Sequence, residues 1–245
     1  ARARAADLDI VLEIEGLTND RLREELGELA RVPAEDRLYG PGTTPIMAAF
    51  THLNGQGSRF TDGSYGVYYA ARTIGTAVAE TRFHRARFLA ATREPPIEID
   101  MRSYASDIDA DLHDIAGLQT ERPDLYAPDP ARYGPAQAFA RALRAAGSNG
   151  IHYSSVRDPG GECIAVFRPR VLRPAVQGKH YCYVWDGERI TDVYVKTESG
   201  CDATRTFGFE IAPRELMTTK QLQREKCRRL WHKAQIRNGI HMITG

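Results

Sequence analysis

A tyrosine-rich strand that runs directly into a capped helix constrains this 245-residue chain more than any other feature. Residues 66–71 alternate in a way that predicts a strand with its two tyrosines on opposite faces. Thr73 suits the N-cap of a helix over 74–89 that turns its apolar residues inward. Glu80 lies on that helix, and a buried carboxylate needs a partner. The alternative is an exposed, solvated Glu80.

The remaining elements do not alternate strand and helix regularly, which favours an α+β fold over a doubly wound sheet. Prolines predict irregular structure over Asp107–Arg132. Gly147 suits the left-handed residue that ends a helix, and Asp186-Gly187 suits a hairpin turn. The other expected elements are a strand over Ile97–Asp100, a helix over Gln137–Ala146, and strands over Ile151–Ser154, Cys163–Arg168, Tyr181–Trp185 and Arg189–Val195.

The two ends of the chain differ in pattern from its middle. Helical spacing begins after Asn19-Asp20 and ends at Val32-Pro33. From Pro213 the pattern is helical and basic, with eight Lys or Arg and two Glu over 214–245. Such a segment is either a solvated terminal helix or a surface for a partner or nucleic acid. We therefore expect three parts, which are an N-terminal helical extension (1–32), a catalytic domain (33–196) and a basic helical C-terminal extension (197–245).

Composition excludes several classes of function. The net charge is +1, so the chain as a whole has no strong attraction to nucleic acid or to a membrane surface. No apolar run approaches the roughly 18–20 residues that span a bilayer. The first residues lack the apolar core of a signal peptide, which favours a cytoplasmic protein.

Familiar metal and phosphate motifs are also missing from the sequence. The four cysteines form no C-x-x-C pair and the seven histidines no H-E-x-x-H motif, so we expect no metal site. No G-x-G-x-x-G follows a predicted strand, and no G-x-x-x-x-G-K-[ST] is present. A nucleotide would therefore be bound by other means.

Two arginines beside Gly-rich segments suit an anionic ligand. Arg37 precedes the Gly/Pro-rich loop 39–45, and Arg59 lies within Gly57–Phe60. A planar guanidinium can bind two phosphate oxygens at once. Ser155 ends a predicted strand and has no nucleophile motif around it, so we expect it to donate hydrogen bonds rather than to attack. Ordinary surface positions are the alternative for each arginine.

In their order and combination these segments resemble the RES domain, a family named for its Arg, Glu and Ser. The resemblance covers roughly two-thirds of the chain, from Arg37 to Val195. The segments that carry it are Arg37, Gly57–Phe60, Tyr68–Ala71, Thr76–Glu80, Tyr153–Cys163 and Tyr183–Gly187.

This resemblance implies a fold like that of ADP-ribosyltransferase toxins, with mixed and antiparallel sheets and surrounding helices. RES proteins are typically toxins of bacterial type II toxin–antitoxin pairs. Their partner is commonly an Xre-like DNA-binding antitoxin, and their known activities consume NAD. The resemblance thus implies a cytoplasmic enzyme with NAD as substrate and an antitoxin as protein partner. It implies no nucleic-acid binding by the core, and it leaves a homodimer open.

The family pattern also implies the site residues. Its arginine, glutamate and serine match Arg37, Glu80 and Ser155, which would be catalytic. The expected NAD-binding residues are Arg37, Arg59, Tyr69 with Tyr68 as its alternative, and Ser154 as the alternative to Ser155.

Cleavage of the nicotinamide–ribose bond explains why one carboxylate suffices. Positive charge builds on the ribose, as in glycoside hydrolysis, but nicotinamide leaves from a cationic pyridinium and needs no general acid. Glu80 would stabilise the transition state electrostatically. Arg37 and Arg59 would hold the pyrophosphate, Tyr69 would pack against the nicotinamide, and Ser155 would hydrogen-bond the ribose or the carboxamide.

Three functions fit these residues. The first is a toxin that depletes NAD as a glycohydrolase or a phosphorylase, with water or phosphate as the acceptor. The second is a mono-ADP-ribosyltransferase, for which a target protein is the acceptor. The third is a non-catalytic binding module in which Arg37, Arg59 and Glu80 form a structural ion-pair network.

Overall fold

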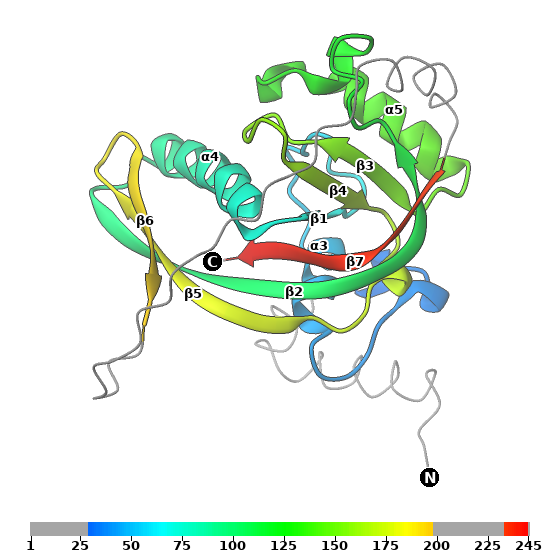
Figure 1. The fold of residues 1–245 in the computed structure, drawn as a ribbon, viewed down its shortest axis with the longest axis horizontal. Coiled ribbons are helices and arrows are strands. Elements are labelled where there is room, and N and C mark those ends of the chain that lie inside the picture. The colour runs from blue at the N-terminus through cyan, green and yellow to red at the C-terminus, as the bar shows by residue number, and fades with distance from the viewer. Residues whose placement is uncertain (1–28, 198–232, 245) are drawn as a thin grey trace, which may run out of the picture.

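The computed structural model describes residues 29–197 and 233–244 (Figure 1). Within these ranges, three α-helices and a mixed sheet confirm the predicted α+β class. The helices are α3 (Thr44–Thr51), α4 (Ile74–Thr92) and α5 (Gly134–Ala145), with short 3-10 helices η1 (Leu29–Arg31), η2 (Ala34–Asp36), η3 (Pro123–Tyr126), η4 (Pro130–Arg132) and η5 (Pro169–Val171). The strands are β1 (Tyr68–Ala71), β2 (Ile97–Asp114), β3 (Gly150–Ser154), β4 (Glu162–Val166), β5 (Val176–Trp185), β6 (Ile190–Lys196) and β7 (Lys233–Thr244).

The sheet closes on itself over five of its strands. Its seven strands follow the order β3-β4-β1-β7-β2-β5-β6, and β2 also pairs with β3. That closing contact is parallel, with His113 opposite Ile151, whereas the other pairings are antiparallel. The hairpin of β5 and β6 extends from this ring along the N-terminal half of β2, where β5 pairs with residues 97–105 (Figure 1).

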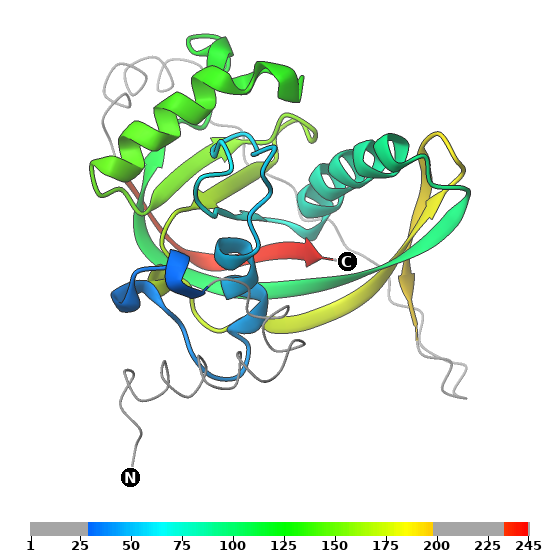
Figure 2. The same ribbon diagram turned by 180° about the vertical axis from the view of Figure 1, so that it is seen from behind.

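Two hydrophobic cores lie on opposite faces of β1. The first core joins β1 to α4, α5 and β3, with Ala71 and Tyr153 buried and Tyr69 packed against it. The second core joins β1 to α3 and β2, and it contains Tyr68 and Phe50. The predicted alternation of the two tyrosines is therefore confirmed. Figure 2 shows α3 and the N-terminal segment apart from α4.

Helices α4 and α5 begin and end as their sequences predict. The side chain of Thr73 accepts a hydrogen bond from the Thr76 amide, which confirms the expected N-cap of α4. Helix α4 ends at Thr92, three residues later than expected, where Arg93 adopts a left-handed conformation. Gly147 has φ +84° just after α5, as predicted, because glycine takes that conformation without steric cost.

Strand β2 is much longer than predicted. It continues from Ile97 to Asp114, so the expectation of irregular structure is wrong for residues 107–114. Three exposed aspartates alternate there with buried Ile108, Ala110 and Leu112. Aspartate disfavours strands, but the alternating burial of apolar neighbours outweighs that preference.

The expected helix at the C-terminal end is also wrong where the structure describes it. Residues 233–244 form β7, which pairs with β2 from Lys233 opposite His113 to Thr244 opposite Arg102. The predicted boundary at 196–197 therefore separates β7 from the sheet it completes. The expected helical segments over 19–28 and 213–232 lie outside the described residues, and residues 29–31 form the 3-10 helix η1.

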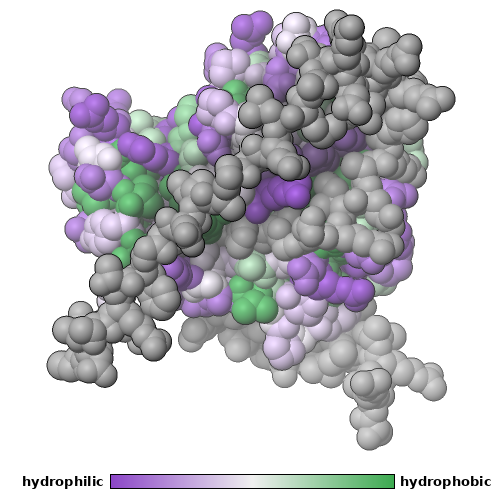
Figure 3. Space-filling model, viewed as in Figure 1, coloured by the Kyte–Doolittle hydropathy of each residue, from purple (hydrophilic) through white to green (hydrophobic). Residues whose placement is uncertain are grey.

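The described surface mixes polar and apolar residues. Figure 3 shows hydrophobic patches set among hydrophilic side chains on the face that carries α4 and α5. The large exposed apolar side chains include Phe88 on α4 and Tyr194 on β6. No helix within the described residues is both long and apolar enough to cross a membrane.

Candidate active site

Glu80 and Ser155 form the central contact of the candidate site. The Ser155 hydroxyl donates a hydrogen bond to Glu80 Oε1 at 2.6 Å, from the turn after β3 to the second turn of α4. Ser155 is 6% exposed, and its oxygen accepts hydrogen bonds from the backbone amides of Arg157 (3.1 Å) and Asp158 (3.0 Å). With both amides on its oxygen, the hydroxyl directs its one proton to the carboxylate. The turn thus holds Glu80 in a defined orientation.

The turn that carries Ser155 is fixed against the start of α4. The Ser155 amide donates to the Gly161 carbonyl at 2.8 Å, and Thr76 Oγ1 donates to Asp158 Oδ2 at 2.7 Å. A Cβ at Gly161 would lie 2.7 Å from Thr76 Cγ2, so only glycine allows this close approach. Thr76 is buried, and the helix and the turn therefore share one rigid junction.

Ser154 takes a different direction from Ser155. Its hydroxyl oxygen accepts a hydrogen bond from the Gly117 amide at 3.0 Å, on the loop that follows β2. The structure therefore brings Ser155, and not Ser154, to Glu80.

Tyr69 supports the loop that carries Arg59. Its hydroxyl shares a 2.7 Å hydrogen bond with Ser58 and accepts another from the Phe60 amide at 2.9 Å. The Tyr69 and Phe60 rings are stacked, and Phe60 meets Tyr153 edge to face with centroids 5.0 Å apart. Burial is the main reason that the pKa of Tyr69 is raised. A neutral aromatic ring therefore lies beside the candidate site.

Tyr68 lies on the opposite face of β1. It is fully buried in the second core, and its hydroxyl has no hydrogen-bond partner among the described residues. The structure places it away from Glu80, so only one of the two tyrosines faces the candidate site.

Arg59 is buried and held by uncharged groups. One of its terminal nitrogens donates to the Leu125 carbonyl at 3.0 Å and the other to the Tyr133 hydroxyl at 3.3 Å. The guanidinium carbon lies 4.5 Å from the centroid of the Tyr133 ring. Among the described residues, Arg59 forms no ion pair with Glu80 or with any other carboxylate.

One buried ring is surrounded by Glu80, Tyr69 and Arg59. The pKa of Tyr153 is raised well above its usual value, first by burial and then by the neighbours Cys163, Glu80 and Tyr69, while Arg59 lowers it. These side chains come from β1, β3, β4, α4 and the loop of Arg59. They converge because β4 pairs with both β1 and β3, and α4 follows β1 directly.

Cys163 is not a candidate nucleophile. Burial and the nearby Glu80 carboxylate raise the pKa of its thiol to about 12. The thiol therefore stays protonated near neutral pH, and the thiolate is the reactive form.

Arg37 lies apart from these groups. Its Nε donates to the Val32 carbonyl at 2.8 Å, and the next residue, Leu38, packs against the second core with Tyr68. Figures 1 and 2 both show the N-terminal segment well separated from α4. The structure therefore does not bring Arg37 together with Glu80 and Ser155.

Two residues near the site were missed by sequence reasoning. Tyr133 holds Arg59 through its hydroxyl and its ring, but a tyrosine at the start of an Ala-rich helix carries no signal of that role. Arg157 lies in the turn after Ser155, with its guanidinium on the Phe83 ring of α4. It lies two residues after Ser155 in the Tyr153–Cys163 segment, and that position could have marked it as a candidate site residue.

Metal-ligand geometry is not evident in what the structure describes. Within residues 29–197 and 233–244, no group of three or more His, Cys, Asp and Glu side chains is placed to hold a metal ion. A metal-free site stays a prediction.

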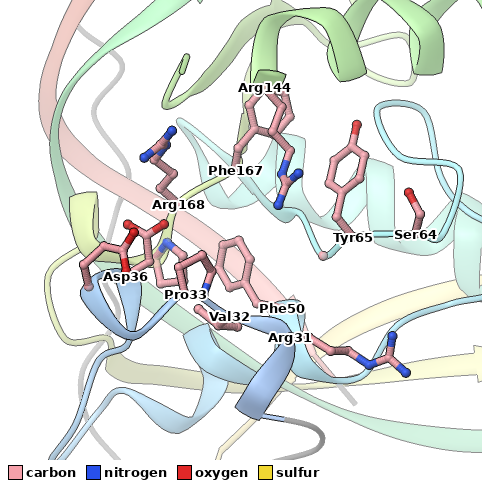
Figure 4. Close-up of a pocket in the computed structure, with 13 residues that line it drawn as sticks. Arg31, Val32, Pro33, Asp36, Phe50, Ser64, Tyr65, Arg144, Phe167 and Arg168 are labelled. Atoms are coloured by element: carbon pink, nitrogen blue, oxygen red, sulfur yellow. The ribbon is translucent and has the colours of Figure 1, made fainter. Parts of the chain in front are cut away.

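A separate cavity of about 300 Å³ lies between the N-terminal segment, α3 and the end of α5 (Figure 4). None of the expected site residues lines it. Arg144 extends into the cavity beside Tyr65, with 4.6 Å between the guanidinium carbon and the ring centroid. The Tyr65 hydroxyl donates to the Phe60 carbonyl at 2.7 Å, which links the cavity wall to the loop of Arg59.

Comparison with known proteins identifies the family. The RES domain family matches residues 29–186. A curated relative, the uncharacterized protein y4oC of Sinorhizobium fredii (strain NBRC 101917 / NGR234), is 33% identical over 196 residues, which cover 79% of each chain. The matched family range contains α4, β3 and β4, and with them both Glu80 and Ser155. This chain therefore belongs to the RES domain family.

Proposed function

We propose that this protein cleaves the nicotinamide–ribose bond of NAD. The observation that carries the proposal is the Ser155 hydroxyl bound to Glu80 at 2.6 Å and fixed by two backbone amides. A carboxylate held in this way is oriented before the substrate arrives, as electrostatic stabilisation of a transition state requires. Membership of the RES family supports NAD as the substrate.

The reaction needs a negative charge more than it needs a proton donor. As the bond to nicotinamide breaks, its electron pair moves to the pyridinium ring and the ribose gains oxocarbenium character. Glu80 would accept a hydrogen bond from a ribose hydroxyl and stabilise that positive charge. Ser155 acts on Glu80 and is a positioning residue in this proposal.

The surroundings of Glu80 suit a dinucleotide. Tyr69 is half-buried and offers an aromatic ring, and Arg59 offers positive charge. Arg37 donates to Val32 instead, so the proposal assigns it no contact with NAD in this conformation.

The biological role follows from the family. We propose that the protein is the toxin of a type II toxin–antitoxin pair, inhibited by an Xre-like antitoxin. The identity of the acceptor decides whether the enzyme is a hydrolase, a phosphorylase or a mono-ADP-ribosyltransferase. Product analysis with and without inorganic phosphate, and transfer of label from NAD to protein, separates these three.

Glu80→Gln is the decisive substitution. It keeps the size of the side chain and removes its charge, so we expect the rate of NAD consumption to fall about 100-fold or more. Free nicotinamide is measured by chromatography with purified protein that carries no bound partner. Glu188→Gln is the matched control, because Glu188 is exposed in the turn between β5 and β6. A folded Glu80→Gln protein with the wild-type rate would show that the proposal is wrong.

A further inference from the structure

Arg157 stands beside the Glu80–Ser155 contact but does not belong to the residues that the family pattern assigns. Its backbone amide donates to Ser155 Oγ, so the residue is tied to the same turn. Its guanidinium carbon lies 3.3 Å from the centroid of the Phe83 ring, which follows Glu80 by three residues on α4. Positions three apart on a helix share one face. Arg157 therefore lies over the helix face that presents Glu80.

The donors of Arg157 are only partly used. One terminal nitrogen donates to the Pro128 carbonyl, whereas Nε is buried and has no hydrogen-bond partner among the described residues. No carboxylate among those residues forms an ion pair with this guanidinium. A buried donor on a charged group is costly when it is unpaired. The terminal N–H groups that the Pro128 carbonyl does not take are left for a ligand acceptor.

Packing holds the Arg157 charge near Glu80 without neutralising it. The pKa of His84 is lowered, first by burial; Glu80 raises it, and Arg157 and Arg59 lower it further, so all three charges act on the same ring of α4. The contacts with Phe83 and Pro128 explain why Arg157 stays in place instead of folding onto the carboxylate.

We infer that Arg157 binds the phosphate groups of the dinucleotide, an inference that rests on the proposed function. The terminal N–H groups of this planar guanidinium can donate to a phosphate oxygen, and its position over the Phe83 ring holds it in place in advance. The other two arginines are less suitable. Both terminal nitrogens of Arg59 already donate within the protein, and Arg37 lies on the side of the second core. Arg157 is therefore a binding residue, whereas Glu80 acts on the reacting bond.

This assignment predicts a selective loss of affinity. Replacing Arg157 with Gln should raise the KM for NAD about 10- to 100-fold, because a charge-assisted hydrogen bond is lost. The Kd of ADP-ribose, measured by calorimetry, should rise by a similar factor, since ADP-ribose carries the same phosphates. Nicotinamide has no phosphate, and its inhibition constant should change less than twofold. Arg157→Lys should recover part of the affinity.

Arg144→Gln is the matched control. Arg144 also stacks on an aromatic ring, but it extends into the separate cavity, so its loss should leave both constants unchanged. Circular dichroism and thermal melting establish that each variant is folded. If Arg157→Gln does not fold, Arg157→Lys and Arg157→Met are measured in the same way.

The outcomes separate this inference from the proposed function. A wild-type protein that neither consumes NAD nor binds ADP-ribose overturns the proposed function. If the wild type consumes NAD and the Arg157 variants keep its KM and its Kd for ADP-ribose, only the role of Arg157 is overturned. A fall in kcat with both constants unchanged also overturns it, because that pattern belongs to a residue that merely shapes the Ser155 turn.

Discussion

Residues next to each other in the sequence serve different parts of this molecule. Tyr69 packs against the first core and supports the Arg59 loop, while Tyr68 is buried in the second core. Ser155 reaches Glu80, while Ser154 binds the loop after β2. The alternation of side chains along β1 separates the two tyrosines. Strand β3 ends at Ser154, and the turn that follows directs Ser155 to Glu80. Where the family motif offers two adjacent candidate residues, the direction of each side chain shows which one reaches the site.

Substitution by phenylalanine should change the free energy of unfolding differently at Tyr69 and at Tyr68. Tyr69→Phe removes the hydrogen bonds with Ser58 and the Phe60 amide, so we expect the free energy of unfolding to fall by about 1–3 kcal/mol. NAD turnover should fall with it, since the loop carries Arg59. Tyr68→Phe removes a buried hydroxyl that has no hydrogen-bond partner among the described residues, so stability should stay the same or rise by about 1 kcal/mol.

Urea unfolding and NAD turnover of both variants check this prediction. An equal loss of stability in the two proteins would contradict it, because it would mean that the Tyr68 hydroxyl is also paired.

At the scale of elements, the junction between α4 and the turn after β3 sets the geometry of the site. Gly161→Ala would place a methyl group 2.7 Å from Thr76 Cγ2 and 2.8 Å from Asp158 Oδ2, and Thr76 is a short, buried side chain that cannot swing away. We expect the turn to shift, with an overpacking cost of about 1–3 kcal/mol. NAD turnover should fall roughly 10- to 100-fold as Ser155 moves from Glu80.

Gly134→Ala at the start of α5 is the control for this change, because an added Cβ there meets nothing within 4 Å. Stability by urea unfolding and turnover are measured for both. Wild-type turnover in Gly161→Ala would mean that the turn is not what orients the carboxylate.

Local patterns predicted the elements around the site better than the elements that close the sheet. The Thr73 cap, the alternation of β1 and Gly147 are local signals, and each was read correctly. The start of β2 at Ile97 was predicted, but its continuation to Asp114 was missed, because the prolines after residue 122 indicated irregular structure over all of 107–132. Strand β7 was missed because its basic composition favours a helix, and its pairing with β2 is a tertiary contact.

Candidate residues were found from motif order, but their grouping needed the fold. Sequence reasoning selected Glu80, Ser155 and Arg59. Ser155 donates a hydrogen bond to Glu80, and Glu80 and Arg59 both affect the pKa of Tyr153. Sequence reasoning also selected Arg37, which lies elsewhere, and it overlooked Arg157. Spacing along the chain does not reveal which face of the sheet a loop residue reaches.

At the scale of the whole molecule, β7 is required for the ring of strands. The RES family matches residues 29–186, yet β7 lies between β1 and β2 and pairs with β2 over 12 residues. A chain truncated after Thr197 would leave both of these strands with an open edge. The backbone hydrogen bonds lost, at about 0.5–1.5 kcal/mol each, together approach the roughly 5–15 kcal/mol stability of a typical domain.

We expect the truncated chain to show no cooperative unfolding transition and to aggregate through its exposed edges. Removal of Gly245 alone, which lies after β7, is the control and should leave the melting temperature unchanged. A truncated protein that melts cooperatively at the wild-type temperature would contradict this view of β7.

The position of β7 has a consequence for synthesis of the protein on the ribosome. Strands β1 and β2 are synthesised well before β7, which pairs with both of them. Ala71 can pair with His241, and Arg102 with Thr244, only once residues 233–244 have been made. Such distant pairings form slowly and leave edges exposed until they do. The ring therefore closes after translation has passed β7, and a ribosome-bound chain that stops short of it holds the residues of the site without a finished scaffold.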